Sequence, residues 1–142
     1  MILYRISQGV WDVFAVCDDD GTCEVLDELL RLEAGNKQEK GLANKMFALL
    51  KQWVPGRMQG PQTHNENISK HLSGKVYEFK KGQKKGPKIR VLWFYGNRRQ
   101  VICTACFLKT NKVPQSLIDK AEDLSVQFKD DLAAGNIEII GE

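Results

Sequence analysis

The sequence lacks an apolar run close to the roughly 20 residues that a helix needs to span a bilayer. Its first segment is partly apolar but is interrupted by charged and polar residues, and it lacks both the basic start and the small-residue cleavage site of a signal peptide. It also contains no internal repeat and no low-complexity tract. We therefore expect a soluble, cytoplasmic protein with a single domain over residues 1–142.

Signals for metal or redox chemistry are weak. Asp18, Asp19 and Asp20 precede a glycine, but no acid follows at the spacing of a calcium loop, so the pattern favours a solvated turn. Cys103 and Cys106 form a CxxC inside an apolar strand run. Residues three apart on a strand point to opposite faces, so we expect the two sulfurs to diverge and to be structural thiols. We expect no metal and no cofactor.

Positive charge is concentrated in the stretch Leu72–Lys112. This stretch holds eleven Lys or Arg and a single acid, Glu78, which gives it a net charge of +10 within a chain of +3. The remainder of the chain therefore sums to −7. A basic segment on an acidic remainder predicts a polyanion bound on one surface rather than a diffusely basic protein.

Apolar periodicity predicts an α+β protein. Ile2–Cys17 is expected to form one or two strands, followed by a helical hairpin made of Glu24–Ala34 and Lys37–Val54. A polar loop, Gly56–Ser69, comes next and carries His64. Three strands then form an antiparallel meander. These predicted strands are Lys75–Phe79, Ile89–Tyr95 and Val101–Leu108.

The C-terminal part predicts one more helix, which begins at Pro114 and ends at Gly135. The short apolar tail Asn136–Glu142 is expected to pair with a strand edge or to meet a partner. The economical arrangement packs the N-terminal helical hairpin and the C-terminal helix on one side of a small antiparallel sheet.

Four blocks of sequence occur in order with fitting spacing. They are Leu72–Lys80, Ile89–Tyr95, Cys106–Pro114 and Leu117–Ala121. Together they resemble the RelE/HigB superfamily of toxins from bacterial type II toxin–antitoxin systems, in particular its phage-derived HigB-like branch. The resemblance covers roughly residues 40–125 and implies a RelE-like fold, whereas residues 1–36 match only loosely. A cysteine replaces the family's glycine before Phe107, and a single lysine replaces its Lys-Lys pair.

The resemblance implies a ribosome-dependent endoribonuclease that transfers an mRNA phosphodiester to the neighbouring 2′-hydroxyl without a metal. Such a reaction needs a base, an acid for the leaving oxygen, and cations for the phosphate charge. Arg90 matches the family's phosphate-binding arginine, and Lys109 and Lys112 match its lysines after the last strand. The alternative for Arg90 is an ion pair with Glu78 across the hairpin.

Two further residues complete the predicted catalytic set. Tyr77 is suited to stack on a base or donate a proton, and His71 is suited to act as the base because its reference pKa lies near neutrality. Their alternatives are a core or rim position for Tyr77 and a position on the loop surface for His71 and His64. Seven further cations of the basic stretch are expected to contact ribosomal RNA without reading sequence. They are Lys80, Lys81, Lys84, Lys85, Lys88, Arg98 and Arg99.

The resemblance also implies partners. They are mRNA, the ribosome and a cognate helix-turn-helix antitoxin that covers the basic groove, with no membrane involved. Two other functions stay open. One is a non-catalytic RNA- or ribosome-binding module on the same fold, which the shortened lysine block near Lys109 favours. The other is a phage-derived protein-interaction domain that docks through its last helix and apolar tail.

Overall fold

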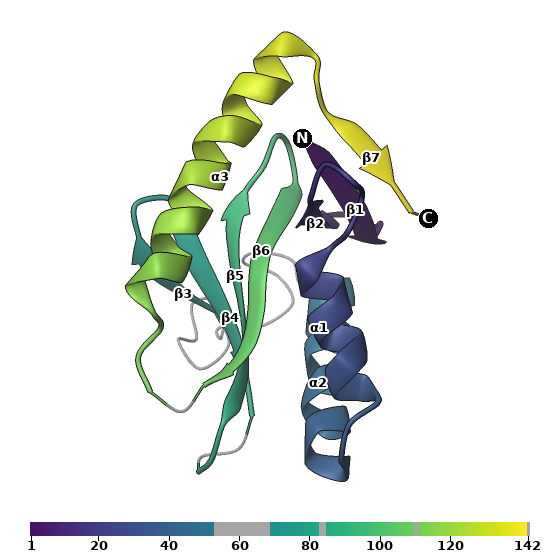
Figure 1. Cartoon of the computed structure of the whole chain (residues 1–142), viewed down its shortest axis with the longest axis vertical. Coiled ribbons are helices and arrows are strands. Elements are labelled where there is room, and N and C mark those ends of the chain that lie inside the picture. The colour runs from purple at the N-terminus through teal and green to yellow at the C-terminus, as the bar shows by residue number, and fades with distance from the viewer. Residues whose placement is uncertain (53–68, 83–84, 110, 142) are drawn as a thin grey trace.

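The computed structural model describes residues 1–52, 69–82, 85–109 and 111–141 (Figure 1). Within these residues one seven-stranded sheet has the order β3-β4-β5-β6-β2-β1-β7. The strands are β1 Ile2–Ser7, β2 Asp12–Cys17, β3 Ser69–Ser73, β4 Val76–Lys81, β5 Lys88–Tyr95, β6 Gln100–Lys109 and β7 Glu138–Ile140. The helices are α1 Glu24–Glu33, α2 Lys37–Gln52 and α3 Gln115–Ala134.

The α+β class is confirmed, but the sheet is larger than predicted and is mixed. Strands β3 to β6 form the expected antiparallel meander, extended by β3. Strand β2 then pairs in parallel with β6, and β7 pairs in parallel with β1. The prediction of a small antiparallel sheet was wrong because hairpin signals are local, whereas parallel pairs join segments far apart in the chain.

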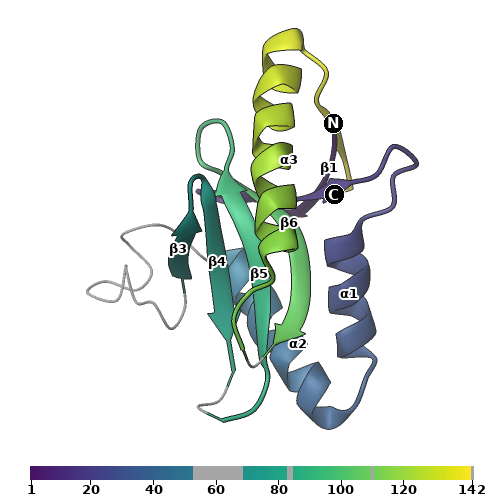
Figure 2. The same ribbon diagram turned by 60° about the vertical axis from the view of Figure 1, so that its left-hand side comes forward.

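Helices lie on both faces of the sheet rather than on one (Figure 2). On one face α1 and α2 pack on a cluster that includes Phe79, Val91 and Trp93. On the other face Phe128 of α3 packs near Phe94. Every residue from Val91 to Phe94 is buried, as expected for a strand that is covered by helices on both faces and has no polar side. The prediction that the helices share one side was therefore wrong.

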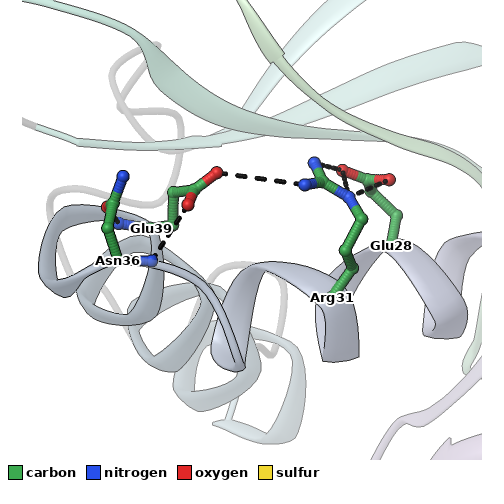
Figure 3. A network of polar contacts seen from close by, with 4 residues as sticks. All are labelled: Glu28, Arg31, Asn36 and Glu39. Atoms are coloured by element: carbon green, nitrogen blue, oxygen red, sulfur yellow. Dashed lines mark hydrogen bonds and ion pairs between the residues drawn. The ribbon is translucent and has the colours of Figure 1, made fainter.

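A reciprocal cap fixes the turn between α1 and α2. The backbone N–H of Glu39 donates to Asn36 Oδ1 at 2.8 Å, and the backbone N–H of Asn36 donates to Glu39 Oε1 at 3.0 Å (Figure 3). This capping box stabilises a helix start by about 1 kcal/mol. It confirms the predicted start of α2, whereas residues 53 and 54 of the predicted helix and the loop at 56–68 lie outside the described residues.

A bulge in β6 changes where the cysteines point. Leu92 pairs with Ala105 but Trp93 pairs with Cys103, which leaves Thr104 as an extra residue. As a result Cys103 and Cys106 contact the same cluster beneath α1, so the prediction that their sulfurs diverge was wrong. Burial raises the pKa of the Cys103 thiol well above its usual value, which keeps it protonated and unreactive.

Two general features of the described residues bear on function. No group of three or more His, Cys, Asp or Glu side chains among them is arranged to hold a metal ion. None of the helices in this part of the chain is long and apolar enough to cross a membrane.

Candidate nucleic-acid interface

Four cations gather on the α3 side of the sheet. Ile89, Val91 and Leu108 contact the cluster under α1 and α2, so the residues between and beside them point to the opposite face. We call this group the cationic patch; it consists of Lys80, Lys88, Arg90 and Lys109. The first turns of α3 cover the neighbouring part of the same strands, where Ile118 packs in one buried cluster with Leu92 of β5. The strands continue past the N-terminal end of α3, and the patch lies on this continuation (Figure 2).

The strand register brings like charges together within the patch. Lys80 lies directly opposite Arg90, and Lys88 lies directly opposite Lys109. Like charges in directly opposite positions destabilise a sheet. Two such pairs on one face favour a bound anion that offsets their repulsion.

One carboxylate is buried beside the patch. Glu78 is only 1% exposed, and its Oε2 accepts a hydrogen bond from Arg90 Nη1 at 2.9 Å, while the Arg90 side chain is 12% exposed. The alternative predicted for Arg90 is therefore observed. Arg90 Nε is buried and has no hydrogen-bond partner among the described residues. Glu78 thus holds the guanidinium in place but does not use all five of its donors.

Tyr77 and His71 lie on the other face of the sheet. The Tyr77 ring stacks on Trp93 with a centroid distance of 4.8 Å, and the His71 ring lies 4.9 Å from Tyr77. His71 Nε2 also lies 2.7 Å from the carbonyl oxygen of Gly74. The predicted catalytic residues are therefore divided by the sheet, and these two rings do not meet Arg90.

The other predicted RNA-contacting residues are spread over the molecule. Lys112 is exposed in the segment between β6 and α3, and Lys81 lies on the α2 side of β4. Arg98 and Arg99 occupy the turn after β5, at its opposite end from Lys88, with φ angles of 35° and 55°. Two predicted positions, 64 and 84, lie outside the described residues. The basic stretch therefore supplies several separate charged regions.

The sequence reasoning missed a basic cavity on α2. Lys85, a predicted RNA contact, lines a cavity of about 410 Å³ together with Lys37 and Lys45 of α2, and Leu42 and Pro87 form part of its wall. The signal was present in the sequence, because residues eight apart lie on one face of a helix. The cavity was not predicted because Lys37 and Lys45 lie in α2, outside the most basic stretch of the chain.

The patch lies within a region shared with known phage-derived proteins. Residues 36–125 match the family described as phage-derived Gp49-like protein (DUF891). Since this match spans well over half of the chain, the protein belongs to the Gp49-like family. The matched region runs from the cap of α2 to the middle of α3 and includes the whole cationic patch, whereas β1, β2, α1 and β7 lie outside it. A search of curated proteins found no significant match.

Proposed function

We propose that this Gp49-like protein is the toxin of a type II toxin–antitoxin system and inhibits translation by cutting mRNA on the ribosome. Its family is associated with toxins of such systems. The observation that carries the proposal is the cationic patch, in which two opposed pairs of cations share one face with a single buried acid. Such a surface is suited to a phosphodiester backbone.

The cations of the patch would bind a phosphodiester, offset the charge that develops on it and protonate its leaving oxygen. Arg90, held by Glu78, would bind a phosphate oxygen through its remaining donors, since a guanidinium binds phosphate at two points. Lys88 and Lys109 would neutralise the charge that develops on the phosphorane-like transition state. The 2′-hydroxyl of the preceding ribose would attack the phosphorus and lose its proton to water, while the bond from phosphorus to the 5′-oxygen breaks and the ammonium of Lys109 protonates that oxygen.

The proposed partners follow from the activity. A nuclease that cuts translated mRNA needs an inhibitor in its own cell, and we propose a helix-turn-helix antitoxin in this role. Lys112 and the cavity lined by Lys37, Lys45 and Lys85 would add attraction to ribosomal RNA that depends on salt but not on sequence.

A second function is favoured by a specific observation. Tyr77 and His71 lie across the sheet from Arg90, and Arg90 is engaged with Glu78. A module that binds RNA or the ribosome without cutting would need the cations but neither of those rings. This alternative shares the patch with the nuclease and differs only in chemistry.

Induced expression in growing bacteria tests the nuclease. We expect growth to stop and primer extension on translated mRNA to show cuts at a fixed position within codons. Lys88→Ala and Lys109→Ala should abolish cutting without unfolding the protein, because both lysines are partly exposed members of the patch and neither forms an ion pair with another described residue. Arg90→Lys should impair it, since lysine keeps the charge but loses the planar fork.

The matched control is Lys129→Ala, which removes one exposed lysine from α3 outside the patch and should leave cutting intact. If growth continues and no codon-positioned cuts appear, the nuclease proposal fails. Sedimentation with ribosomes that is lost in the Lys88 and Lys109 variants, without any cutting, would establish the binding module instead.

A further inference from the structure

Strand β6 has an open edge over more than half of its length. Its first residues pair with β2 from Gln100 to Cys103. Beyond the bulge at Thr104, Ala105–Lys109 pairs with β5 on one side, and no described strand pairs with this part of β6 on the other. Figure 1 shows this part of β6 continuing past β2 alongside α1. In an antiparallel strand every second residue turns its N–H and C=O to the same side, so about three residues present unpaired groups at this edge.

The open edge faces a slot between the two helical layers. A cavity of about 490 Å³ is lined by Ala105, Cys106 and Phe107 of β6, by residues of α1, and by Leu117 of α3. Cys106 belongs to the α1 side of the sheet, whereas Ala105 and Phe107 belong to the α3 side. The cavity therefore lies in the plane of the sheet, with one helix on either side. This is the position that an added strand would occupy.

The two walls of the slot differ in chemistry. The α1 wall carries Glu24, Asp27 and Glu28. Its single cation in the cavity, Arg31, is engaged by Glu28 and lies within ion-pair distance of Glu39 (Figure 3). On the α3 side the lining is apolar and consists of Phe107 of β6 and Leu117 of α3, while Lys120 of α3 reaches Glu24 of the α1 wall at 3.4 Å. Successive side chains of a strand point to opposite sides, so an occupant would place basic side chains toward α1 and apolar ones toward α3.

We propose that the open edge of β6 binds an extended segment of a partner protein by strand addition, and that this segment alternates Lys or Arg with apolar residues. Backbone hydrogen bonds to Thr104–Lys109 supply affinity, and the acidic and apolar walls supply specificity. The open part of β6 is about as long as an average strand. The site is distinct from the cationic patch and has the opposite charge, so it does not depend on the nuclease proposal.

Native-state hydrogen exchange tests the open edge itself. Alternate amides within Thr104–Lys109, those not bonded to β5, should exchange rapidly, while their neighbours on the same strand are protected. Uniform protection along this segment would overturn the proposal, since it would mean that the edge is already covered.

Titration with a synthetic strand tests binding. The probe is the peptide acetyl-VKVKVKV-amide, followed by amide resonances of the full-length protein. We expect resonances of Thr104–Lys109 and of the acidic side of α1 to shift, and the fast-exchanging amides to become protected. A peptide with alternate amides methylated should not bind, because it cannot complete the backbone ladder. The glutamate analogue acetyl-VEVEVEV-amide should not bind either, because of the acidic wall.

A pair of charge variants locates the site. Asp27→Lys should weaken binding of the lysine peptide by about tenfold, because it places a like charge on the exposed rim of the slot. Asp130→Lys makes the same change of charge on an exposed position of α3 away from the slot and should leave the affinity unchanged. Equal weakening in both variants, or peptide shifts confined to other strands, would overturn the proposal. So would concentration-dependent dimerisation through β6, which would identify a second copy as the occupant.

Discussion

The α3-facing side of β4, β5 and β6 has two halves of opposite character. Under the helix, Leu92 and Phe94 are fully buried against residues of α3. Past the N-terminal end of α3, where the helix no longer covers the sheet, the same strands carry Arg90 with Lys80, Lys88 and Lys109. One half gains stability from burial, whereas the other sets like charges side by side at a cost to stability.

This difference separates the residues that hold the fold from those available for function. A substitution in the packed half should lower stability and leave affinity for RNA unchanged in the folded fraction. A substitution in the cationic half should change affinity with little loss of stability, or even with a gain. Glu78 lies at the boundary, because it is buried like the packed residues and charged like the patch.

The largest effect is expected in the packed half. Phe128→Ala should lower the free energy of unfolding by about 3–5 kcal/mol, because Phe128 is 5% exposed and packs edge-on against Phe94. Urea unfolding measures the change. At a temperature where the variant is folded, its affinity for single-stranded RNA should equal that of the parent. A matching fall in affinity would mean that α3 belongs to the RNA surface.

Removing the boundary acid should have opposite effects on the two properties. Glu78→Ala leaves Arg90 without its partner, so we expect a loss of about 3 kcal/mol in unfolding free energy together with tighter RNA binding by the folded protein. Glu33→Ala removes an exposed acid of α1 and should change neither property appreciably. If Glu78→Ala left stability unchanged, the ion pair would not be the structural link described above.

Reversing one charge of the patch should stabilise the protein. Lys88→Glu places a carboxylate directly opposite Lys109 and converts repulsion into attraction, which should raise the unfolding free energy by about 0.5–1 kcal/mol. The same change should weaken RNA binding. Thermal unfolding at low salt measures the first effect, with Lys129→Glu as the control on α3. If Lys88→Glu instead lowered the unfolding free energy, the claim that Lys88 and Lys109 repel each other across the two strands would be contradicted.

The smallest effect is expected in the turn after β5. Arg99 has a φ of 55°, a conformation that costs a non-glycine residue about 1 kcal/mol, so Arg99→Gly should be neutral or stabilise the fold by up to about 1 kcal/mol. Its backbone oxygen would still accept the hydrogen bond from the Asp12 N–H at 2.9 Å. Because this turn is far from Lys88 along β5, cutting or RNA binding at the patch should persist. A large loss of either would extend the functional surface to this end of the sheet.

Local sequence signals predicted much of this fold, and most of the errors concern contacts between segments that are far apart in the chain. The three strands of the basic stretch, the start of α2 and the end of α3 at Gly135 followed from periodicity and capping residues. Strand β3, Ser69–Ser73, was missed because its polar sequence has no apolar alternation. The parallel pair of β2 with β6 was missed because nothing in the local sequence specifies a distant partner. The C-terminal tail was expected to pair with a strand edge or to meet a partner, and β7 does pair with β1.

The candidate site was predicted in composition but not in arrangement. The basic stretch and the possible pairing of Arg90 with Glu78 were both anticipated, and the pairing is observed. The division of the predicted set was not anticipated, although the period of two already separates Tyr77 from Lys80 across the sheet. The bulge at Thr104, which directs Cys103 and Cys106 to one face, leaves no sign in the sequence.

The salt dependence of RNA binding tests the cationic patch most directly. For a single-stranded RNA of about 12 nucleotides, each phosphate contact contributes about 0.7 to the slope of log K against log salt. The triple variant with Lys80, Lys88 and Lys109 changed to Gln should therefore lower the slope by about 2. The control changes the exposed residues Lys40, Lys51 and Lys129 to Gln and should keep the parent slope. An unchanged slope in the patch variant, or an equal loss in the control, would contradict the assignment of this half of the sheet to a polyanion.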